Sequence, residues 1–354
     1  MKDTNGGRSV SALATGRFGN AMSAAGSRLT ASSVFYLLCA LILMCAVFGA
    51  FKARSFLSAY NIVTVLSDSS VLMIMAIGQM FVITTAGIDL SVGGVLVFSG
   101  VVANMVMVAL GGKGFGPVFI GFLIAVLLGL AWGWLNGFLI AKIHIPPLIT
   151  TLGTSGMSLG FALLMTNGSD LGGIPTELPT YLGVGKFLGV IPWLVIIALT
   201  VVIAASIVLR LTRFGLYTIA IGANPEAARR SGISVDRELI KVYAICGFLA
   251  GLAAYLNLAR FSSTTIAGHG SDNLQTIAAV VLGGTSLMGG IASIMGTVIG
   301  VFIPIVLQNG LIMLSVRPFW QQVLIGAILI IAVYSDQLKR RGDVPIKEKN
   351  PQGD

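Results

Sequence analysis

Long apolar runs constrain this chain more than any other feature of its sequence. About ten such runs follow one another, separated by short polar connections. With 56% hydrophobic and 10% charged residues, most of the chain has lipid as its solvent. The sequence therefore predicts an all-α, polytopic transmembrane helical bundle, with spans at 33–51, 61–84, 93–110, 117–141, 147–166, 190–210, 240–259, 275–288, 292–313 and 319–335.

These spans form one membrane domain, which we expect at residues 33–336. Residues 1–32 are polar and rich in Gly, Ser and Ala, which predicts a flexible cytoplasmic tail, and residues 337–354 predict a second cytoplasmic tail. A cleaved signal peptide is the alternative for the N-terminus. The run at 33–51 is longer than a usual signal core, and no clear A-x-A site follows it.

The run at 275–288 is short and rich in Gly and Thr, so a full crossing and a re-entrant segment both remain open. If all ten runs cross, most of the 22 Lys and Arg residues fall on the side of the two termini. Because cytoplasmic loops carry the excess of Lys and Arg, this predicts cytoplasmic N- and C-termini. The same topology explains the net charge of +9, so no nucleic-acid partner is expected.

Several chemistries have no support in the sequence. The three cysteines lie in apolar runs without C-x-x-C spacing, and His144 and His269 lie in short loops, which favours solvated imidazoles over a metal site. No G-x-x-x-x-G-K-[ST] motif is present to bind phosphates, so no catalytic residue and no cofactor is expected on this chain. Asp68 is the only charge clearly inside a span, facing either a polar cavity or the outer interface.

Small residues recur at four-residue spacing in several of the expected spans. Such faces let helix backbones approach closely, because lipid provides no hydrophobic drive for association. The pattern predicts a tightly packed bundle, with contacts through Gly129, Gly133 and Gly137, Gly156 and Gly160, Gly247 and Gly251, and Gly296 and Gly300.

The longest charged loop, at 210–241, contains NPEAARRSG at 224–232. Asn224 is a good N-cap, Pro225 suits the first helical position, and Gly232 suits a left-handed C-terminal cap. The loop therefore predicts a short, basic helix that protrudes into the cytoplasm. A connector that lies on anionic lipid headgroups is the alternative.

Glu226, Ala227, Ala228 and Gly232 match the E-A-A-x-x-x-G core of the loop by which ABC importer permeases dock on their ATPases, although the downstream I-x-L-P is absent. Two further stretches, TTAGIDLSVG at 84–93 and IAAVVLGGTSLMGG at 277–290, resemble the signature segments of ribose-type sugar permeases. With the QNG segment at 308–310, the resemblance covers about residues 55–335.

This resemblance implies the permease subunit of an ABC importer for a monosaccharide or related polyol, in the bacterial inner membrane. The implied partners are ABC ATPase subunits that hold ATP and Mg, a second permease copy in a homodimer or related heterodimer, and an extracytoplasmic sugar-binding protein. Membrane lipid surrounds the complex. Glu226 would help to start the coupling helix, and Arg229 and Arg230 would meet the ATPase.

Asp89 follows Gly87 in the break between two spans, so it either caps the third helix or lines the translocation path. A path for a neutral polyhydroxyl solute needs amides and hydroxyls more than fixed charges. Each such residue can also serve as a helix-to-helix hydrogen bond. The pathway candidates are Gln79, Thr84, Asp89, Ser91, Asn136, Thr154, Thr285, Gln308 and Asn309.

Two other functions remain as alternatives. One is an ABC permease for branched-chain amino acids or another small solute, which a panel of labelled solutes would distinguish. The other is a membrane scaffold or sensor that does not transport, which would form a stable complex without solute-stimulated ATPase activity. The Gly- and Pro-rich outward loop at 167–189, with the segment 260–273, is the expected docking surface for a binding protein.

Overall fold

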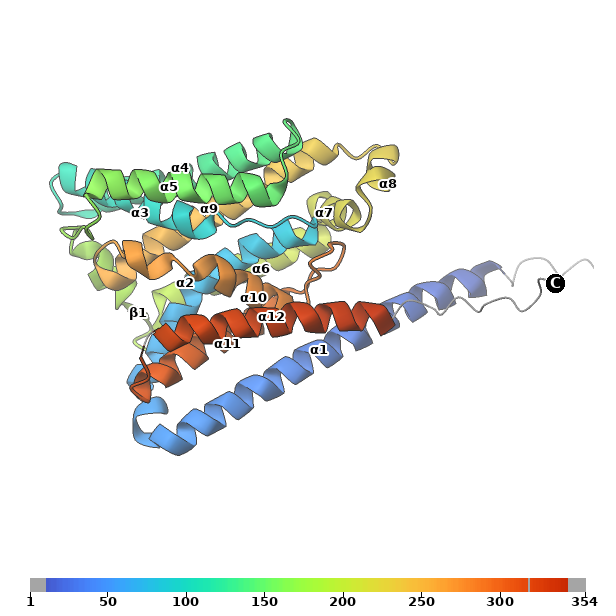
Figure 1. Ribbon diagram of the computed structural model, residues 1–354, viewed down its shortest axis with the longest axis horizontal. Coiled ribbons are helices and arrows are strands. Elements are labelled where there is room, and N and C mark those ends of the chain that lie inside the picture. The colour runs from blue at the N-terminus through green and yellow to red at the C-terminus, as the bar shows by residue number, and fades with distance from the viewer. Residues whose placement is uncertain (1–10, 318, 343–354) are drawn as a thin grey trace, which may run out of the picture.

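A computed structural model describes residues 11–317 and 319–342 as a bundle of helices that run roughly in one direction (Figure 1). A short hairpin of β1 (Lys186–Phe187) and β2 (Ile191–Pro192) lies at one end, which we call the hairpin end, and α8 lies at the other, the α8 end. The helices are α1 (Ser11–Phe56), α2 (Ala59–Thr84), α3 (Val92–Ala109), α4 (Phe115–Ala141), α5 (Pro147–Thr166), η1 (Leu178–Gly183), α6 (Trp193–Leu211), α7 (Arg213–Ala223), α8 (Pro225–Arg230), α9 (Val235–Phe261), η2 (Ile266–His269), α10 (Asp272–Leu282), α11 (Ile294–Met313) and α12 (Phe319–Gly342).

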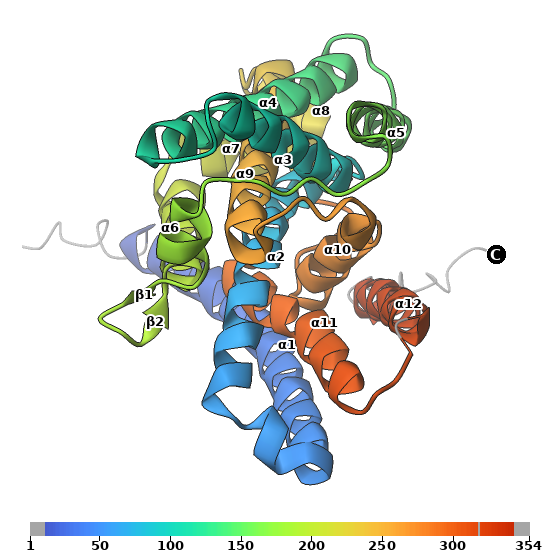
Figure 2. The same ribbon diagram turned by 90° about the vertical axis from the view of Figure 1, so that its left-hand side faces the viewer.

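Two helices form the centre of this bundle. Figure 2, which looks along the bundle from the hairpin end, shows α2 and α9 in the middle, with α3, α4 and α5 on one side and α10, α11 and α12 on another. The central part of α2 is almost fully buried, including Ile74, Ile77 and Met80. The core therefore lies along α2 and α9, and the outer helices expose apolar side chains where lipid would surround them.

Eight of these helices, α1 to α6, α9 and α11, are long and apolar enough to cross a membrane. They correspond to eight of the expected spans, so the predicted polytopic bundle is confirmed. The tenth expected span corresponds to α12. The eighth differs, because α10 has only eleven residues, about 16 Å, which is half of the roughly 30 Å hydrocarbon core.

The rest of the eighth segment is a loop that continues along the bundle. Residues 283–293 run from α10 toward the α8 end (Figure 1), where the N–H of Gly290 donates to the carbonyl of Thr84 at 2.9 Å. α11 then starts from this end, and α12 returns to it, so α12 ends on the same side as the start of α1. This course supports a crossing that is half helix and half loop.

At the N-terminus the structure describes a helix in place of the predicted flexible tail. α1 begins at Ser11, so residues 11–32 are helical instead of a flexible tail. Once the apolar part of α1 has formed, each added residue costs little, because the helix needs no new nucleus. α12 likewise continues past the predicted boundary at 336 to Gly342. The tail residues 1–10 and 343–354 lie outside the described residues.

Glycines allow α4 and α9 to pack backbone against backbone. A Cβ on Gly133 would lie 2.9 Å from the Cα and N of Gly247, and one on Gly137 would lie 2.7 Å from the Cα of Ile240. This confirms the tight packing that the small-residue spacing predicts. Gly156 and Gly160 differ, because α5 turns that face to open space within this chain.

We expect Gly133→Ala to destabilise the bundle by about 1–3 kcal/mol, because the new methyl overlaps the α9 backbone and neither helix can yield locally. In detergent this corresponds to a melting temperature lower by about 5 °C. Gly116→Ala is the control on the same helix, since a Cβ there meets no atom within 4 Å. Equal melting temperatures for both variants would contradict the close α4–α9 contact.

Candidate translocation and coupling site

α8 is a capped helix of six residues at the end of the bundle. The Asn224 side chain accepts a hydrogen bond from the N–H of Ala227 at 3.0 Å, and Pro225 occupies the first turn. At the other end, Gly232 has φ +84°, the N–H of Ile233 donates to Ala228, and the N–H of Gly232 donates to Arg229. These two bonds form a Schellman motif. The predicted caps at both ends are confirmed.

One face of α8 is anchored and the other is open. Ala228 is buried in a small apolar cluster with Ile221 of α7 and Val235 of α9. On the outer face Arg229 and Arg230 have 58% and 79% of their side chains exposed. α8 therefore presents exposed guanidinium groups while its buried face ties it to α7 and α9.

α7 connects α8 to both signature segments at a junction of backbones. A Cβ on Gly222, near the end of α7, would overlap the carbonyl of Thr84 and lie 2.5 Å from the N of Gly290. Gly289 and Gly290 have φ near +80° and lie against Gly222 and Ala223. We call this contact of residues 84–86, 222–223 and 289–290 the coupling junction. No side chain separates the three segments, so a shift of α7 has to displace the other two or break the contact.

The break between α2 and α3, residues 85–91, is held by side chains from three other segments. With its amide oriented to satisfy both groups, Gln79 donates to the carbonyl of Asp89 at 3.1 Å and accepts from its N–H at 3.2 Å. The Thr151 hydroxyl donates to the carbonyl of Ile88 at 3.2 Å. Non-helical backbone needs such partners, because lipid offers no hydrogen bonds.

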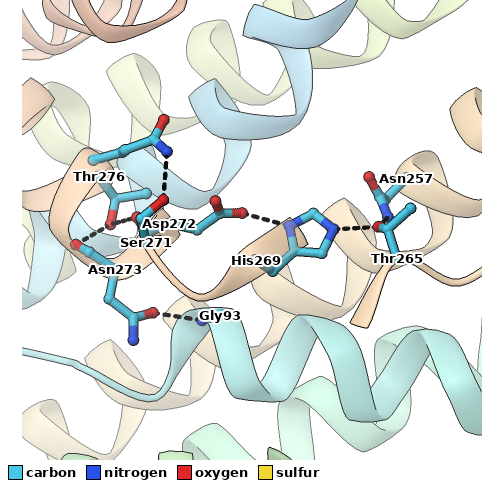
Figure 3. A network of polar contacts seen from close by, with 9 residues as sticks. Gly93, Asn257, Thr265, His269, Ser271, Asp272, Asn273 and Thr276 are labelled. Carbon is cyan, nitrogen blue, oxygen red and sulfur yellow. Dashed lines mark hydrogen bonds and ion pairs between the residues drawn. The ribbon is translucent and has the colours of Figure 1, made fainter. Parts of the chain in front are cut away.

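Asn273 of α10 completes this support. Its Nδ2 donates to the carbonyl of Leu90 at 2.6 Å, and its Oδ1 accepts from the N–H of Gly93 at 2.7 Å. Figure 3 shows the contact with Gly93, in the first turn of α3. One amide thereby caps α3 from a different helix and ties the first signature segment to α10, the helix that leads into the second.

The Asp89 carboxylate does not cap the helix as expected. Its Oδ1 accepts from the N–H of Ser91 at 2.8 Å and from the Ser91 hydroxyl at 2.6 Å, so it closes a turn before α3 begins. Asn136 of α4 donates to the same hydroxyl at 2.8 Å. Asp89, Ser91 and Asn136, all at most 1% exposed, form a buried polar cluster with Gln79.

A cavity of about 400 Å³ lies in the half of the bundle nearer the hairpin end, between α2, α9, α10 and α11. Apolar walls come from Val71, Leu72 and Met75 of α2 and Ile305 and Ile312 of α11. Its polar lining comes from eight side chains, Asp68, Asn257, Thr265, His269, Asp272, Gln275, Gln308 and Asn309. The cavity is thus apolar on some walls and rich in hydrogen-bonding groups on others.

A continuous set of hydrogen bonds runs along one wall of this cavity (Figure 3). Asn257 Nδ2 donates to Thr265 Oγ1 at 2.9 Å, Thr265 Oγ1 lies 2.7 Å from His269 Nε2, and His269 Nδ1 lies 2.6 Å from Asp272 Oδ2. A carboxylate only accepts, so Nδ1 carries the proton that faces Asp272, and in the neutral imidazole Nε2 then accepts from the Thr265 hydroxyl. The prediction of a solvated imidazole for His269 was wrong.

Asp68 lies at the cavity and has a partner that the sequence did not reveal. Arg260, at the end of α9, donates from Nε to Asp68 Oδ1 at 2.9 Å. On another wall Asn309 and Asn61 exchange hydrogen bonds at 3.0 and 2.9 Å. The first of the two expected positions for Asp68, a polar cavity, is the observed one.

The structure separates the pathway candidates into three groups. Gln308 and Asn309 line the cavity, whereas Gln79, Asp89, Ser91 and Asn136 form the buried cluster. The three threonines serve the backbone: Thr84 bonds to Met80 and Thr154 to Thr150 within their helices, and Thr285 accepts from the N–H of Ser293. None of these seven lines the cavity of this chain.

Four residues that line the cavity are not among the pathway candidates predicted from the sequence: Asn257, His269, Asp272 and Gln275. Asn257 and Gln275 are amides inside apolar runs, which is the same signal that selected Gln308. The other two became significant only when the turn at 262–271 placed them together.

Comparisons with known proteins agree on one kind of protein. A family model described as "Branched-chain amino acid transport system / permease component" matches residues 61–333. The chain is 38% identical to a ribose import permease protein of Escherichia coli K12 over 310 residues, 86% of this chain and 93% of that protein. It is 34% identical to a galactose/methyl galactoside import permease protein of the same strain, covering 82% and 90%, and 32% identical to a fructose import permease protein of Rhizobium meliloti, covering 85% and 84%. No solved structure matches.

We expect Asn273→Leu to destabilise the protein, because it leaves a partly buried carbonyl and the N–H of Gly93 without partners, at up to about 1–3 kcal/mol for each. The melting temperature in detergent should fall by about 5 °C or more. Thr200→Val, which removes an exposed hydroxyl from α6, is the control. A variant of Asn273 that melts with the wild type would show that the break at 85–91 does not depend on α10.

Proposed function

This chain belongs to the permease-component family that its residues 61–333 match, and from that membership we propose that it is the membrane-spanning subunit of an ABC importer. Its cargo is a monosaccharide or related polyol, carried across the bacterial inner membrane. The observation that carries this proposal is the similarity to ribose, galactose and fructose import permeases along more than four fifths of the chain.

Within this proposal α8 is the element that docks on the ATPase. Its exposed Arg229 and Arg230 give it the charge to meet an acidic groove, and Glu226 pairs with Arg230 at 3.3 Å. The ATPase subunit supplies ATP and Mg, and this chain supplies no catalytic group. Movement of α8 would pass through α7 to the coupling junction, which has to open before cargo leaves the cavity toward the α8 end.

The orientation follows from the same proposal. The α8 end is cytoplasmic, together with both chain termini, in agreement with the Lys and Arg excess on that side. The hairpin end faces the extracytoplasmic binding protein. Two loops meet there, since Thr264 and Leu171 exchange hydrogen bonds and Asp170 accepts from the N–H of Ile266 at 2.7 Å. A second permease copy, identical or related, completes the pathway.

Branched-chain amino acids are the second candidate cargo, and the description of the matching family favours them. An amino acid presents an ammonium and a carboxylate, both of which need partners of opposite charge. No Lys or Arg is among the described residues that line the cavity, and the guanidinium of Arg260 near it already binds Asp68. A neutral polyol requires no such charge pair, so the monosaccharide is the better fit.

The test is to reconstitute the full complex with its ATPase and binding protein and to compare Gly232→Ala with Gly189→Ala. Both glycines have left-handed φ, +84° and +74°, so alanine costs each site about 1–2 kcal/mol. Only Gly232 ends α8, so Gly232→Ala should lower sugar-stimulated ATPase activity and uptake at least tenfold, and Gly189→Ala should leave both within twofold. If both variants keep normal activity, or if both lose it equally, the docking role of α8 is contradicted.

A further inference from the structure

The cavity near the hairpin end has the size and lining of a binding site for a small polar solute. Its volume of about 400 Å³ falls within the roughly 300–1,000 Å³ typical of small-ligand pockets. We propose that each permease chain binds the sugar there during transport, through Asn257, Asp272, Gln275 and Gln308. This inference rests on the proposed function and adds to it a discrete cargo site inside the permease.

Each of these four side chains keeps hydrogen-bonding capacity for a ligand. Among the described residues, Asn257 uses only Nδ2, toward Thr265, and Gln275 uses only Nε2, toward Ser271. The side-chain carbonyls of both residues therefore have no internal partner. The amide of Gln308 makes no hydrogen bond within the described chain, although it lines the cavity. Amides that both donate and accept suit hydroxyl groups, which do the same.

Asp272 has one oxygen fixed and one available. His269 holds Oδ2 at 2.6 Å, and the described chain offers no hydrogen bond to Oδ1. The sequence of bonds from Asn257 through Thr265 and His269 orients this carboxylate before any ligand arrives (Figure 3). Such pre-organisation lowers the entropic cost of binding.

Apolar walls face these polar groups across the cavity. Val71 and Met75 lie on one helix and Ile305 on another, and Phe261 closes the side near the end of α9. A sugar ring presents C–H groups on its faces and hydroxyls around its rim, so it can satisfy both kinds of wall. A zwitterionic amino acid would leave its carboxylate without a cation, because no Lys or Arg is among the described residues that line the cavity.

The cavity also lies at a suitable point along the bundle. The residues that form it belong to the half nearer the hairpin end, whereas the coupling junction lies in the half nearer the α8 end. A solute released from a binding protein at the hairpin end would reach the cavity and stop until the junction opened. The cavity is therefore an intermediate binding site that holds the sugar until the ATPase drives the junction open.

The test uses the complete complex in liposomes, with its ATPase and binding protein, and radiolabelled D-ribose, D-galactose and D-fructose as probes. ATP hydrolysis stimulated by loaded binding protein and sugar uptake are measured together. Gln308→Leu and Asn257→Leu should lower uptake per ATP at least tenfold while stimulated hydrolysis stays within twofold. Gln308→Asn should change the ratio of uptake rates between two of the sugars, which a purely structural role would not do.

Two glycines provide a matched control for filling the cavity. Gly268 lines it, and Gly270, two residues later, does not; neither has a left-handed φ, and neither would place a Cβ closer than 3.6 Å to a neighbour. Gly268→Leu should reduce uptake per ATP as Gln308→Leu does, and Gly270→Leu should not. Size-exclusion chromatography restricts the comparison to assembled complexes.

The outcomes separate this inference from the function on which it rests. If the wild type transports a sugar and Gln308→Leu, Asn257→Leu and Gly268→Leu all keep normal uptake per ATP, the cargo site is wrong and the importer stands. If no sugar stimulates hydrolysis or enters the liposomes, and leucine does, both the proposed cargo and the site are wrong. If uptake fails equally in Gly268→Leu and Gly270→Leu, occupancy of the cavity does not explain the loss, which also overturns the inference.

Discussion

Every backbone N–H and C=O of a membrane-embedded chain needs a partner within the protein, because hydrocarbon provides none. This fold contains two long departures from helix at depth in the bundle, at residues 85–91 and 283–293. Gln79, Thr151 and Asn273 serve the first, while Thr285 and the carbonyl of Thr84 serve the second. Both non-helical segments are stable in lipid because neighbouring residues form hydrogen bonds with their backbone N–H and C=O groups.

The same two non-helical segments also position the residues of the coupling junction. They meet Gly222 and Ala223 directly, so the end of α7 rests on both signature segments without an intervening side chain. α8 extends from α7 on one side of this junction, and the polar cavity lies on the other. In the proposed function, α8 as docking helix, the coupling junction as closure and the cavity as cargo site follow one another within one chain. A small displacement of α8 has a direct route to the closure.

Much of this arrangement could be predicted from the sequence, and the rest depends on contacts between distant residues. Hydropathy located the spans, and local capping chemistry at Asn224, Pro225 and Gly232 located α8, because both signals involve neighbours in the chain. Asp68 appeared unpaired because Arg260 is 192 residues away. His269 appeared solvated because nothing near it in the sequence shows that the turn at 262–271 folds onto a cavity. For the eighth run, the sequence left a full crossing and a re-entrant segment open. A helix of eleven residues followed by a hydrogen-bonded loop has the same apolar, Gly-rich sequence as a short span.

Opening of the coupling junction is the central step of this account, and one disulfide tests it directly. A Cβ on Gly290 would lie 3.1 Å from that of Ala223, so a separation of a few tenths of an ångström brings the pair to the roughly 3.5–4.5 Å of a disulfide in Ala223→Cys with Gly290→Cys, made after alanine replaces the three native cysteines. With the complex in liposomes, sugar uptake is measured before oxidation, after it and after reduction. If the junction has to open, oxidation lowers uptake at least tenfold, reduction restores it, and neither single-cysteine variant responds. Equal uptake in the oxidised and reduced double variant would contradict it, because cargo would then pass a junction that cannot open.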